Sequence, residues 1–227
     1  MQLKRSASWD TTATMARVDI KMNPLLVASM GLACTLLSCC ICPQSMAAQS
    51  NIPWDTAQVW TDFDAALQRP ERVWRLDLTK QKWKAVDVRL RRFRQLREIV
   101  LDKNKIDSLP PWIGEFEHLE RLSIRSNQLT QIPPGLLQLS NLRELDLSDN
   151  EIEGIPEDID ALAKLERLLL WSNVIGHFPP SLSHLEFLQE LDLLNNEMSV
   201  DEQTWVRELL PGRRLSFSPP CRCQFDD

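Results

Sequence analysis

Residues 141–159 read NLRELDLSDNEIEGIPEDI. The three leucines near its start (Leu142, Leu145 and Leu147) are too closely spaced for one face of a helix, and they do not keep the strict alternation of a half-buried strand. Asn150 interrupts the apolar run, and a proline further on excludes a continuous helix through the segment. An isolated helix or strand therefore does not account for this spacing.

The same spacing returns every 23 residues, without a slip of register, from Val73 to Asn196. With Leu142 as position one, positions one, four and six are aliphatic in six successive segments. Asparagine occupies position nine in the last five segments: Asn104, Asn127, Asn150, Asn173 and Asn196. Proline occupies position fifteen in four of them: Pro110, Pro133, Pro156 and Pro179. A fixed period of this length indicates a solenoid of stacked repeats.

The segments LREIVLDKNKIDSLPPWI (96–113) and LRELDLSDNEIEGIPEDI (142–159) fit the pattern LxxLxLxxNxLxxLPxxIxxL. This pattern resembles the typical leucine-rich repeat and is similar to its 23-residue bacterial type, which is also seen in Ras-binding scaffolds of plants and animals. The resemblance covers residues 73 to about 200. It implies an α/β fold, namely a curved solenoid with a parallel sheet of six strands on the concave face and loops or helical turns on the convex face.

Each repeated position has a physical reason. Positions three to seven predict a short strand whose side chains at four and six face the core, and strands of successive repeats pair in parallel about 4.8 Å apart. Asparagine at position nine ends the strand, because its amide can bond the backbone of a turn that has no regular ladder. Proline at position fifteen favours an extended return segment over a helix.

Helical caps are predicted at both ends of the repeats. TDFDAALQRPERV (61–73) indicates a short helix with Thr61 or Asp62 as N-cap and with Phe63, Ala66 and Leu67 facing inward. The first repeat departs from the pattern, as terminal repeats do, with glutamine at position nine.

SVDEQTWVRELLPG (199–212) contains a capping box, since Glu202 follows Ser199 by three residues. Trp205, Leu209 and Leu210 are expected to form the apolar side of this second helix, and RRLSF (213–217) is expected to be a final edge strand. The predicted organisation is a leader (1–47), a linker and N-terminal cap (48–72), six repeats (73–198), a C-terminal capping helix and strand (199–218) and a tail (219–227).

The leader resembles a secretory signal peptide. Arg17 and Lys21 precede an apolar run from Pro24 to Ile41, and the small residues of SMAAQ (45–49) offer a cleavage site. Two alternatives remain open: LLSC resembles a bacterial lipobox, which would make Cys39 a lipidated N-terminus, and the run approaches the length that spans a bilayer as an uncleaved anchor. All three place the repeats outside the cytoplasm, either secreted, periplasmic or anchored to the envelope.

Charge and residue inventory narrow the function. Without residues 1–47 the chain carries 22 basic and 30 acidic residues, and this acidic balance argues against a nucleic-acid partner. The three histidines (His118, His177 and His184) do not share a repeat with residues that would complete a triad or a metal site, and no glycine-rich phosphate loop occurs. Cys221 and Cys223 are too few for structural zinc. The sequence therefore predicts neither an enzyme nor a cofactor or metal site.

Outward positions five and seven predict the binding site. Most of them are polar, but Val100, Leu169, Trp171 and Leu194 are apolar, and the last three fall on the last two repeat strands. A tryptophan flanked by leucines has the composition of an interaction hot spot. The hypothesis is therefore a protein-binding patch, with a glycan as the second choice of ligand, centred on Trp171 and rimmed by three charged residues: Asp146, Asp192 and Arg125. The alternatives are a tail that folds back over these residues and an envelope spacer with no ligand.

Positions two and three carry alternating charges along the repeats, as in Arg97-Glu98, Glu120-Arg121, Arg143-Glu144 and Glu166-Arg167. Parallel stacking in register would place opposite charges beside each other in both columns. These columns are interpreted as a ladder that fixes the register, with a charged docking surface as the alternative.

Overall fold

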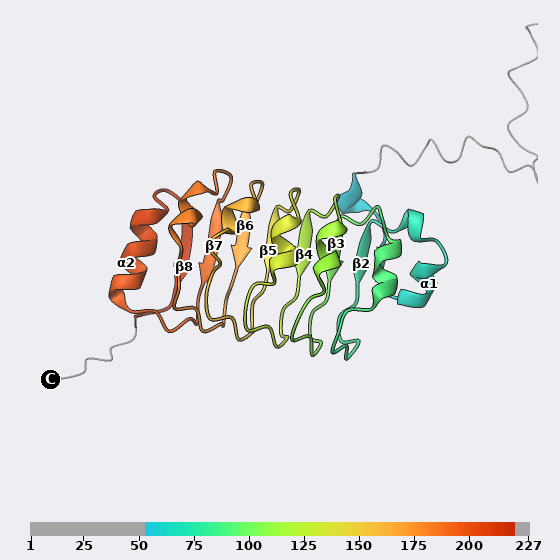
Figure 1. Ribbon diagram of the computed structural model, residues 1–227, viewed down its shortest axis with the longest axis horizontal. Helices are drawn as coiled ribbons and strands as arrows, with labels where there is room; N and C mark the ends of the chain where they lie inside the picture. The colour runs from blue at the N-terminus through green and yellow to red at the C-terminus, as the bar shows by residue number, and fades with distance from the viewer. Residues whose placement is uncertain (1–52, 221–227) are drawn as a thin grey trace, which may run out of the picture. The chain divides into compact units, whose positions relative to one another are not determined.

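The computed structural model describes residues 53–220. The predicted leader with Cys39, and Cys221 and Cys223 of the tail, lie outside the described residues. The described part of the chain is built on one parallel sheet of eight strands that follow each other in sequence order (Figure 1). The strands are β1 (Val59–Trp60), β2 (Arg75–Asp77), β3 (Glu98–Val100), β4 (Arg121–Ser123), β5 (Glu144–Asp146), β6 (Arg167–Leu169), β7 (Glu190–Leu193) and β8 (Arg214–Phe217).

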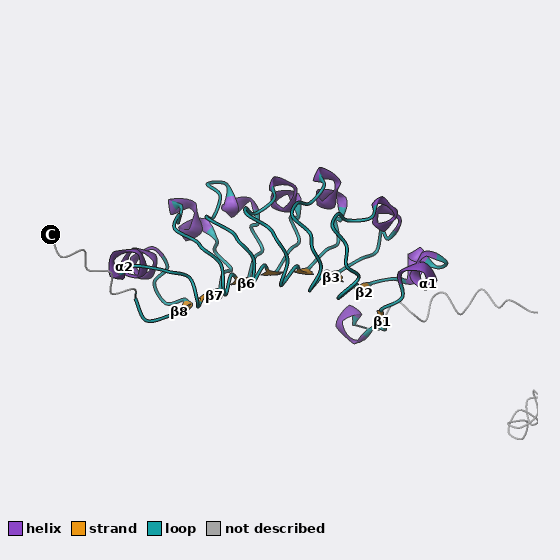
Figure 2. Cartoon of the chain, turned by 90° about the horizontal axis from the view of Figure 1, so that it is seen from below, coloured by secondary structure: helices purple, strands orange, loops and turns teal. Residues whose placement is uncertain are grey.

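Short helices accompany the strands. The 3-10 helices are η3 (Trp54–Thr56), η4 (Pro70–Arg72), η5 (Val88–Arg92), η6 (Pro111–Glu115), η7 (Pro134–Gln138), η8 (Ile159–Ala161) and η9 (Pro180–His184), and the α-helices are α1 (Phe63–Leu67) and α2 (Val200–Leu209). Figure 2 shows an arc with the strands on its inner side and the helices of the repeats on its outer side. The predicted leucine-rich-repeat solenoid, with a parallel sheet on its concave face, is confirmed.

The repeat positions predicted to face the core do so. In the fourth repeat Leu142, Leu145 and Leu147 each have 0% exposure, and the equivalent residues of the other repeats are equally buried. Ile99, Leu122, Leu145 and Leu168 stand in register across β3 to β6. One continuous apolar core therefore runs through the repeats, and each repeat covers the core residues of the next.

The asparagines at position nine form the predicted internal row. Asn150 donates its Nδ2 to the carbonyl oxygens of Ile124 (3.0 Å) and Leu147 (2.9 Å), and its Oδ1 accepts from the backbone N–H of Leu129 (3.1 Å). Asn104, Asn127, Asn173 and Asn196 likewise donate to the carbonyl oxygen 26 residues earlier and accept from the backbone N–H 21 residues earlier. Each amide thus satisfies backbone groups of neighbouring repeats, where the turn leaves no ladder partner.

The residue before position nine has a left-handed backbone in all six repeats, with φ between 53° and 61°. The position is occupied by Lys80, Lys103, Ser126, Asp149, Ser172 and Asn195. This conformation turns the chain out of the strand and is costly for a residue that has a Cβ atom.

Four details differ from the sequence prediction. The strands β3 to β6 cover positions three to five only, and β1 adds a strand that the repeat pattern did not predict. Pro110, Pro133 and Pro179 at position fifteen are extended, but the proline that follows each of them starts a 3-10 helix instead of an extended return segment. Proline suits the first position of a helix because its missing N–H has no partner there in any case.

The fourth difference concerns α2. Its capping box between Ser199 and Glu202 is present, but Trp205 is 45% exposed and does not belong to the inward face. Gln203 and Val206 are buried instead, and the Gln203 side chain donates to the carbonyl oxygen of Ser218 at 3.0 Å. This hydrogen bond allows the polar side chain of Gln203 to be buried on the inward side of α2, where the sequence did not predict it.

The first α-helix, α1, is capped by Asp62, whose side chain accepts from the backbone N–H of Ala65. Ala66 and Leu67 are buried, and Phe63 packs edge-to-face on Trp83 with 5.2 Å between the ring centroids. Trp83 belongs to the atypical first repeat, so its departure from the pattern provides the surface against which α1 packs.

Candidate protein-binding face

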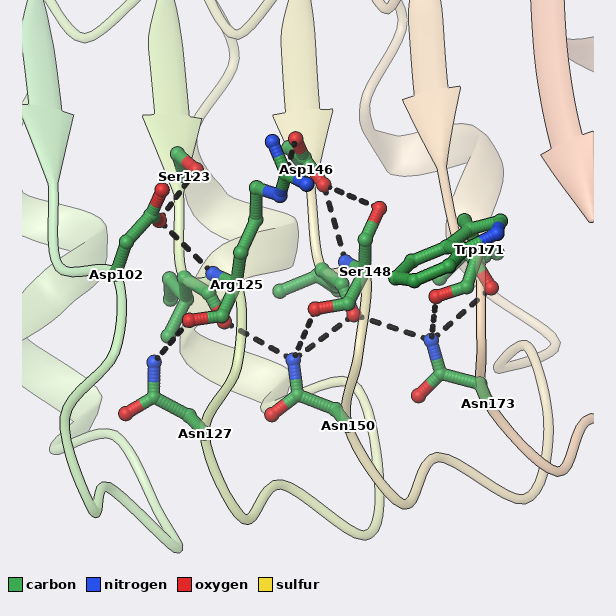
Figure 3. A network of polar contacts seen from close by, with 12 residues as sticks. Asp102, Ser123, Arg125, Asn127, Asp146, Ser148, Asn150, Trp171 and Asn173 are labelled. Carbon is green, nitrogen blue, oxygen red and sulfur yellow. Dashed lines mark hydrogen bonds and ion pairs between the residues drawn. The ribbon is translucent and has the colours of Figure 1, made fainter. Parts of the chain in front are cut away.

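The aspartates at outward positions are used by the fold itself. Asp146 Oδ1 accepts from the backbone N–H (3.0 Å) and the hydroxyl (2.6 Å) of Ser148, and its Oδ2 lies 3.6 Å from Nε of Arg125 (Figure 3). Asp192 Oδ1 accepts from the backbone N–H of Leu194 at 3.0 Å. These carboxylates therefore fix the chain where each strand ends, and the predicted rim residues Asp146 and Arg125 already form a pair.

Three apolar residues on the neighbouring repeats have no comparable structural role. Leu169 stands in register between Asp146 and Asp192. Trp171 lies two residues further along the same repeat, and Leu194 occupies the equivalent position of the next repeat. We call Leu169, Trp171 and Leu194 the apolar patch.

The three members of the patch differ in exposure. Leu194 is 36% exposed, whereas Leu169 and Trp171 are half-buried. The indole ring of Trp171 extends across the face toward Ser148 of the preceding repeat (Figure 3). Trp171 is therefore less exposed than the sequence pattern suggested, because it packs along the face and does not stand away from it.

The structure does not bring Val100 into this patch. Val100 lies on β3, and two strands, β4 and β5, separate it from Leu169 on β6. It borders a shallow depression of about 190 Å³ together with Ser123 and Arg125. Of the predicted site residues, Asp146 and Asp192 thus flank Leu169, whereas Arg125 lies one repeat further away and is paired with Asp146. Val100 lies apart from the patch.

The charged columns at positions two and three are neutralised by cross-strand pairs. In the column formed by position three, Arg167 lies 3.3 Å from Glu144 and 2.9 Å from Glu190. Ion pairs join every neighbouring pair of this column, which consists of Arg75, Glu98, Arg121, Glu144, Arg167, Glu190 and Arg214. In the column formed by position two, Glu120 pairs with Arg97 and Arg143, and Arg143 also pairs with Glu166. The predicted alternation of charges across the strands is confirmed.

An N-terminal segment, Trp54–Thr56, lies on the concave side of the sheet just before β1 (Figure 2). The Trp54 ring stacks on the guanidinium of Arg121, with 4.8 Å from Cζ to the ring centroid, and the carbonyl oxygen of Asp55 accepts from Arg75. Sequence reasoning missed this contact, because the segment carries no repeat pattern that would place it. The segment covers the β2–β4 end of the face, whereas the apolar patch belongs to the other end.

The described beginning of the tail leaves the patch accessible. The hydroxyl of Ser218 accepts from the backbone N–H of Asn195 at 2.7 Å, which places the chain beside Leu194. Leu194 nevertheless keeps its 36% exposure. The alternative in which the tail covers the patch depends on residues 221–227, which lie outside the described residues.

Two of the three histidines form surface pairs with a carboxylate. His177 Nε2 lies 2.9 Å from Glu157, and His184 Nδ1 lies 3.1 Å from Asp160. Within residues 53–220, no three histidine, cysteine or carboxylate side chains are grouped as a metal site would require. No helix in the same range is both long and apolar enough to cross a membrane.

A family model described as leucine rich repeat matches residues 117–175. This chain is a leucine-rich-repeat protein. Such folds generally mediate protein–protein binding, and the proteins that carry them are typically binding modules and not enzymes. The comparison with curated proteins returns no match.

Three solved structures of leucine-rich-repeat proteins are similar to this one. The first, from Leptospira interrogans, is 27% identical with a TM-score of 0.57, and the match covers 72% of this chain and 49% of that chain. The second is the ectodomain of the Arabidopsis thaliana membrane receptor kinase GASSHO1/SCHENGEN3 in complex with CASPARIAN STRIP INTEGRITY FACTOR 2, at 29% identity, TM-score 0.51 and coverage of 57% and 16%. The third is the TLR13–ssRNA13 complex, at 27% identity, TM-score 0.58 and coverage of 65% and 22%. This leucine-rich-repeat protein thus spans about half the length of the Leptospira chain and a smaller part of the other two chains.

Proposed function

We propose that this leucine-rich-repeat protein is a non-enzymatic binding module that works outside the cytoplasm and holds a protein partner on its concave face at the apolar patch. The observation that carries the proposal is the contrast between the patch and the rest of that face. Arg167 and Glu190 neutralise each other, and Asp146 bonds the backbone of its own repeat. Leu169, Trp171 and Leu194 contribute to neither arrangement.

Physical chemistry favours a protein over other partners at this place. An aromatic ring flanked by aliphatic side chains, with charged groups around it, is the usual composition of an energetic centre in protein interfaces. Tryptophan offers a large apolar surface and an indole N–H that can bind a partner's carbonyl group. Nucleic acid is disfavoured because the chain has a net charge of −6, although the TLR13 structure contains RNA.

Location outside the cytoplasm is supported by the leader pattern, in which Arg17 and Lys21 precede the apolar run from Pro24 to Ile41. Processing by signal peptidase and lipidation at Cys39 are both compatible with this proposal. Mass spectrometry of the mature N-terminus distinguishes them, since a lipidated protein would begin with a modified Cys39. An unprocessed chain found in the cytoplasm would contradict the location.

The experiment that tests the binding site compares two tryptophan variants. We expect Trp171→Ala to retain the fold and to lose about 2–4 kcal/mol of binding to a partner captured from envelope or culture-fluid proteins. Trp205→Ala is the matched control, because Trp205 is exposed on α2, away from the strand face. If Trp171→Ala binds as tightly as wild type, or if it unfolds, Trp171 belongs to the scaffold. If the wild-type protein captures no partner from either source, the result supports the alternative of an envelope spacer with no ligand.

A further inference from the structure

A second charged surface lies along one edge of the solenoid. Positions eight, ten and twelve of each repeat lie in the turns that follow the strands, at the lower edge of Figure 1, and we call this row the turn edge. In the first two repeats the turn edge carries five exposed lysines: Lys80, Lys82, Lys84, Lys103 and Lys105. Only one other lysine, Lys164, occurs in residues 53–220.

The charge of the turn edge changes sign along the solenoid. Position twelve of the second repeat is Asp107, so its net charge is smaller than that of the first repeat. The third repeat presents the uncharged Ser126, Gln128 and Thr130. The fourth repeat presents three exposed acidic residues, Asp149, Glu151 and Glu153. From the first to the fourth repeat, the charge of the turn edge therefore changes from positive through neutral to negative.

These charges are not used within the described part of the chain. In residues 53–220, none of the five lysines and none of Asp149, Glu151 and Glu153 forms an ion pair. The strand face differs sharply, because its arginines and glutamates neutralise one another along whole columns. The turn edge thus keeps its full charge for an external partner.

The backbone adds a second observation. Lys80, Lys82 and Lys103 have φ of 61°, 61° and 54°, a left-handed conformation that disfavours a long side chain. Asparagine adopts it at lower cost, and Asn195 occupies the same position as Lys80 in the sixth repeat. The stability of the fold therefore does not favour lysine over asparagine at these positions.

We propose that the turn edge is an interface between two copies of this chain, which meet edge to edge and antiparallel about a two-fold axis. Rotation about an axis between the second and third repeats places the first repeat of one copy against the fourth repeat of the other. Lys80, Lys82 and Lys84 then face the acidic turn of the partner copy, and the same contact forms a second time by symmetry. A parallel arrangement would place like charges together.

The acidic turn favours this occupant over an anionic polymer or lipid surface. Repeats are spaced by about 4.8 Å at the strands, so the turns of the second and fourth repeats lie roughly 10 Å apart. That separation is close to the Debye length at moderate ionic strength, so Asp149, Glu151 and Glu153 would repel an extended anion bound at the lysines. A second copy of the chain is attracted by both the lysines and the acidic turn, because it carries the opposite charge to each. The interface also leaves the strand face free, so the inference does not depend on the proposed binding patch.

The decisive experiment exchanges the charges. One variant combines Lys80→Glu, Lys82→Glu and Lys84→Glu, and the other combines Asp149→Lys, Glu151→Lys and Glu153→Lys. The mass of the full chain is measured by analytical ultracentrifugation at low salt under reducing conditions, so that cysteines outside the described residues cannot cross-link it. We expect a wild-type dimer and two monomeric variants, and we expect an equimolar mixture of the variants to restore the dimer. A monomeric wild type, or a mixture that stays monomeric, overturns the proposal.

Two further measurements keep the test decisive if a reversed variant fails to fold. The variant Lys80→Asn with Lys82→Asn suits the left-handed backbone, so we expect it to melt at or above the wild-type temperature and to weaken the dimer at least tenfold. An unchanged dimer would overturn the proposal. Sedimentation with vesicles containing phosphatidylglycerol tests whether an anionic lipid surface binds the turn edge instead. Lysine-dependent binding to vesicles by a wild-type protein that remains monomeric would also overturn it.

Discussion

The indole ring of Trp54 lies over the guanidinium of Arg121, with 4.8 Å between the ring centroid and Cζ. This contact joins a segment outside the repeats to the third of the repeat strands, β4. It also gives Arg121 an aromatic neighbour in addition to Glu98 and Glu144, its ion-pair partners in the column formed by position three. The N-terminal segment is thereby held against the concave face.

Removal of this ring should have a modest cost. We expect Trp54→Ala to lower the free energy of unfolding by about 0.5–1 kcal/mol, the usual contribution of a cation–π contact at an accessible site. Urea unfolding followed by circular dichroism measures the change. Trp54→Phe is the control, because it retains an aromatic face and should lose less than the alanine variant. Equal losses in both variants would contradict the cation–π interpretation.

The asparagine row predicts a larger effect. Asn150→Ala removes the partners of the Ile124 carbonyl oxygen and the Leu129 N–H, both of which are inside the protein. We expect Asn150→Ala, and likewise Asn127→Ala, to destabilise the fold by about 1–3 kcal/mol.

The chain contains a matched control for this prediction. Gln81 occupies position nine of the first repeat and is exposed, so Gln81→Ala should change the melting temperature little. Unchanged melting curves for Asn127→Ala and Asn150→Ala would contradict the role assigned to the row.

The repeats could be predicted because their signal is periodic. Leu145 and Asn150 are recognisable from residues 23 positions away, and each copy of the pattern confirms the others. Strand β1 has two residues, Val59 and Trp60, and no repeat pattern, so local sequence does not reveal it. The Trp54–Arg121 contact is equally hidden, since it depends on where the chain returns in space.

The sequence predicts which face of the sheet carries the candidate site, but it does not predict how exposed each side chain is. The period places Leu169, Trp171 and Leu194 on the outward face, and the structure has them there. The half-buried state of Trp171 depends on the side-chain conformation that packs it toward Ser148, which no spacing reports. Trp205 shows the opposite difference, because it was predicted to face inward and is exposed. Gln203 is buried on α2 instead, where its side chain donates to the Ser218 carbonyl oxygen.

The first repeat should confer a small acid sensitivity. Asp87 Oδ1 accepts from the backbone N–H of Arg89 (2.8 Å), and its Oδ2 lies 2.7 Å from Nη2 of Arg89. The side-chain hydrogen bond from Arg89 lowers the pKa of Asp87 below its ordinary value. A carboxyl whose pKa is lower in the folded state stabilises the fold above the ordinary value of about 3.9, and this contribution is lost as the pH falls through the lowered pKa.

Asp87→Asn tests this sign. We expect the variant to be slightly less stable than wild type at neutral pH and to approach wild type as Asp87 becomes protonated in strong acid. Urea unfolding at several pH values measures the difference. A stability difference that stays constant from neutral to strongly acidic pH would show that the charge of Asp87 contributes nothing.

The charged columns predict a difference between an inner strand and an edge strand. Arg167 on β6 pairs with Glu144 and Glu190, whereas Arg214 on β8 pairs with Glu190 alone, at 3.6 Å. Arg167→Glu replaces two attractive contacts by two repulsive ones, each worth less than about 1 kcal/mol, so we expect a loss of about 1–2 kcal/mol that shrinks as salt is added. Arg214→Glu should cost less, because that side chain is 77% exposed and has one partner. Thermal melting at low and high salt measures both variants. If Arg167→Glu melts like wild type at low salt yet no longer captures a partner, the columns are a docking surface, because a ladder that fixes register cannot lose its charge alternation without a loss of stability.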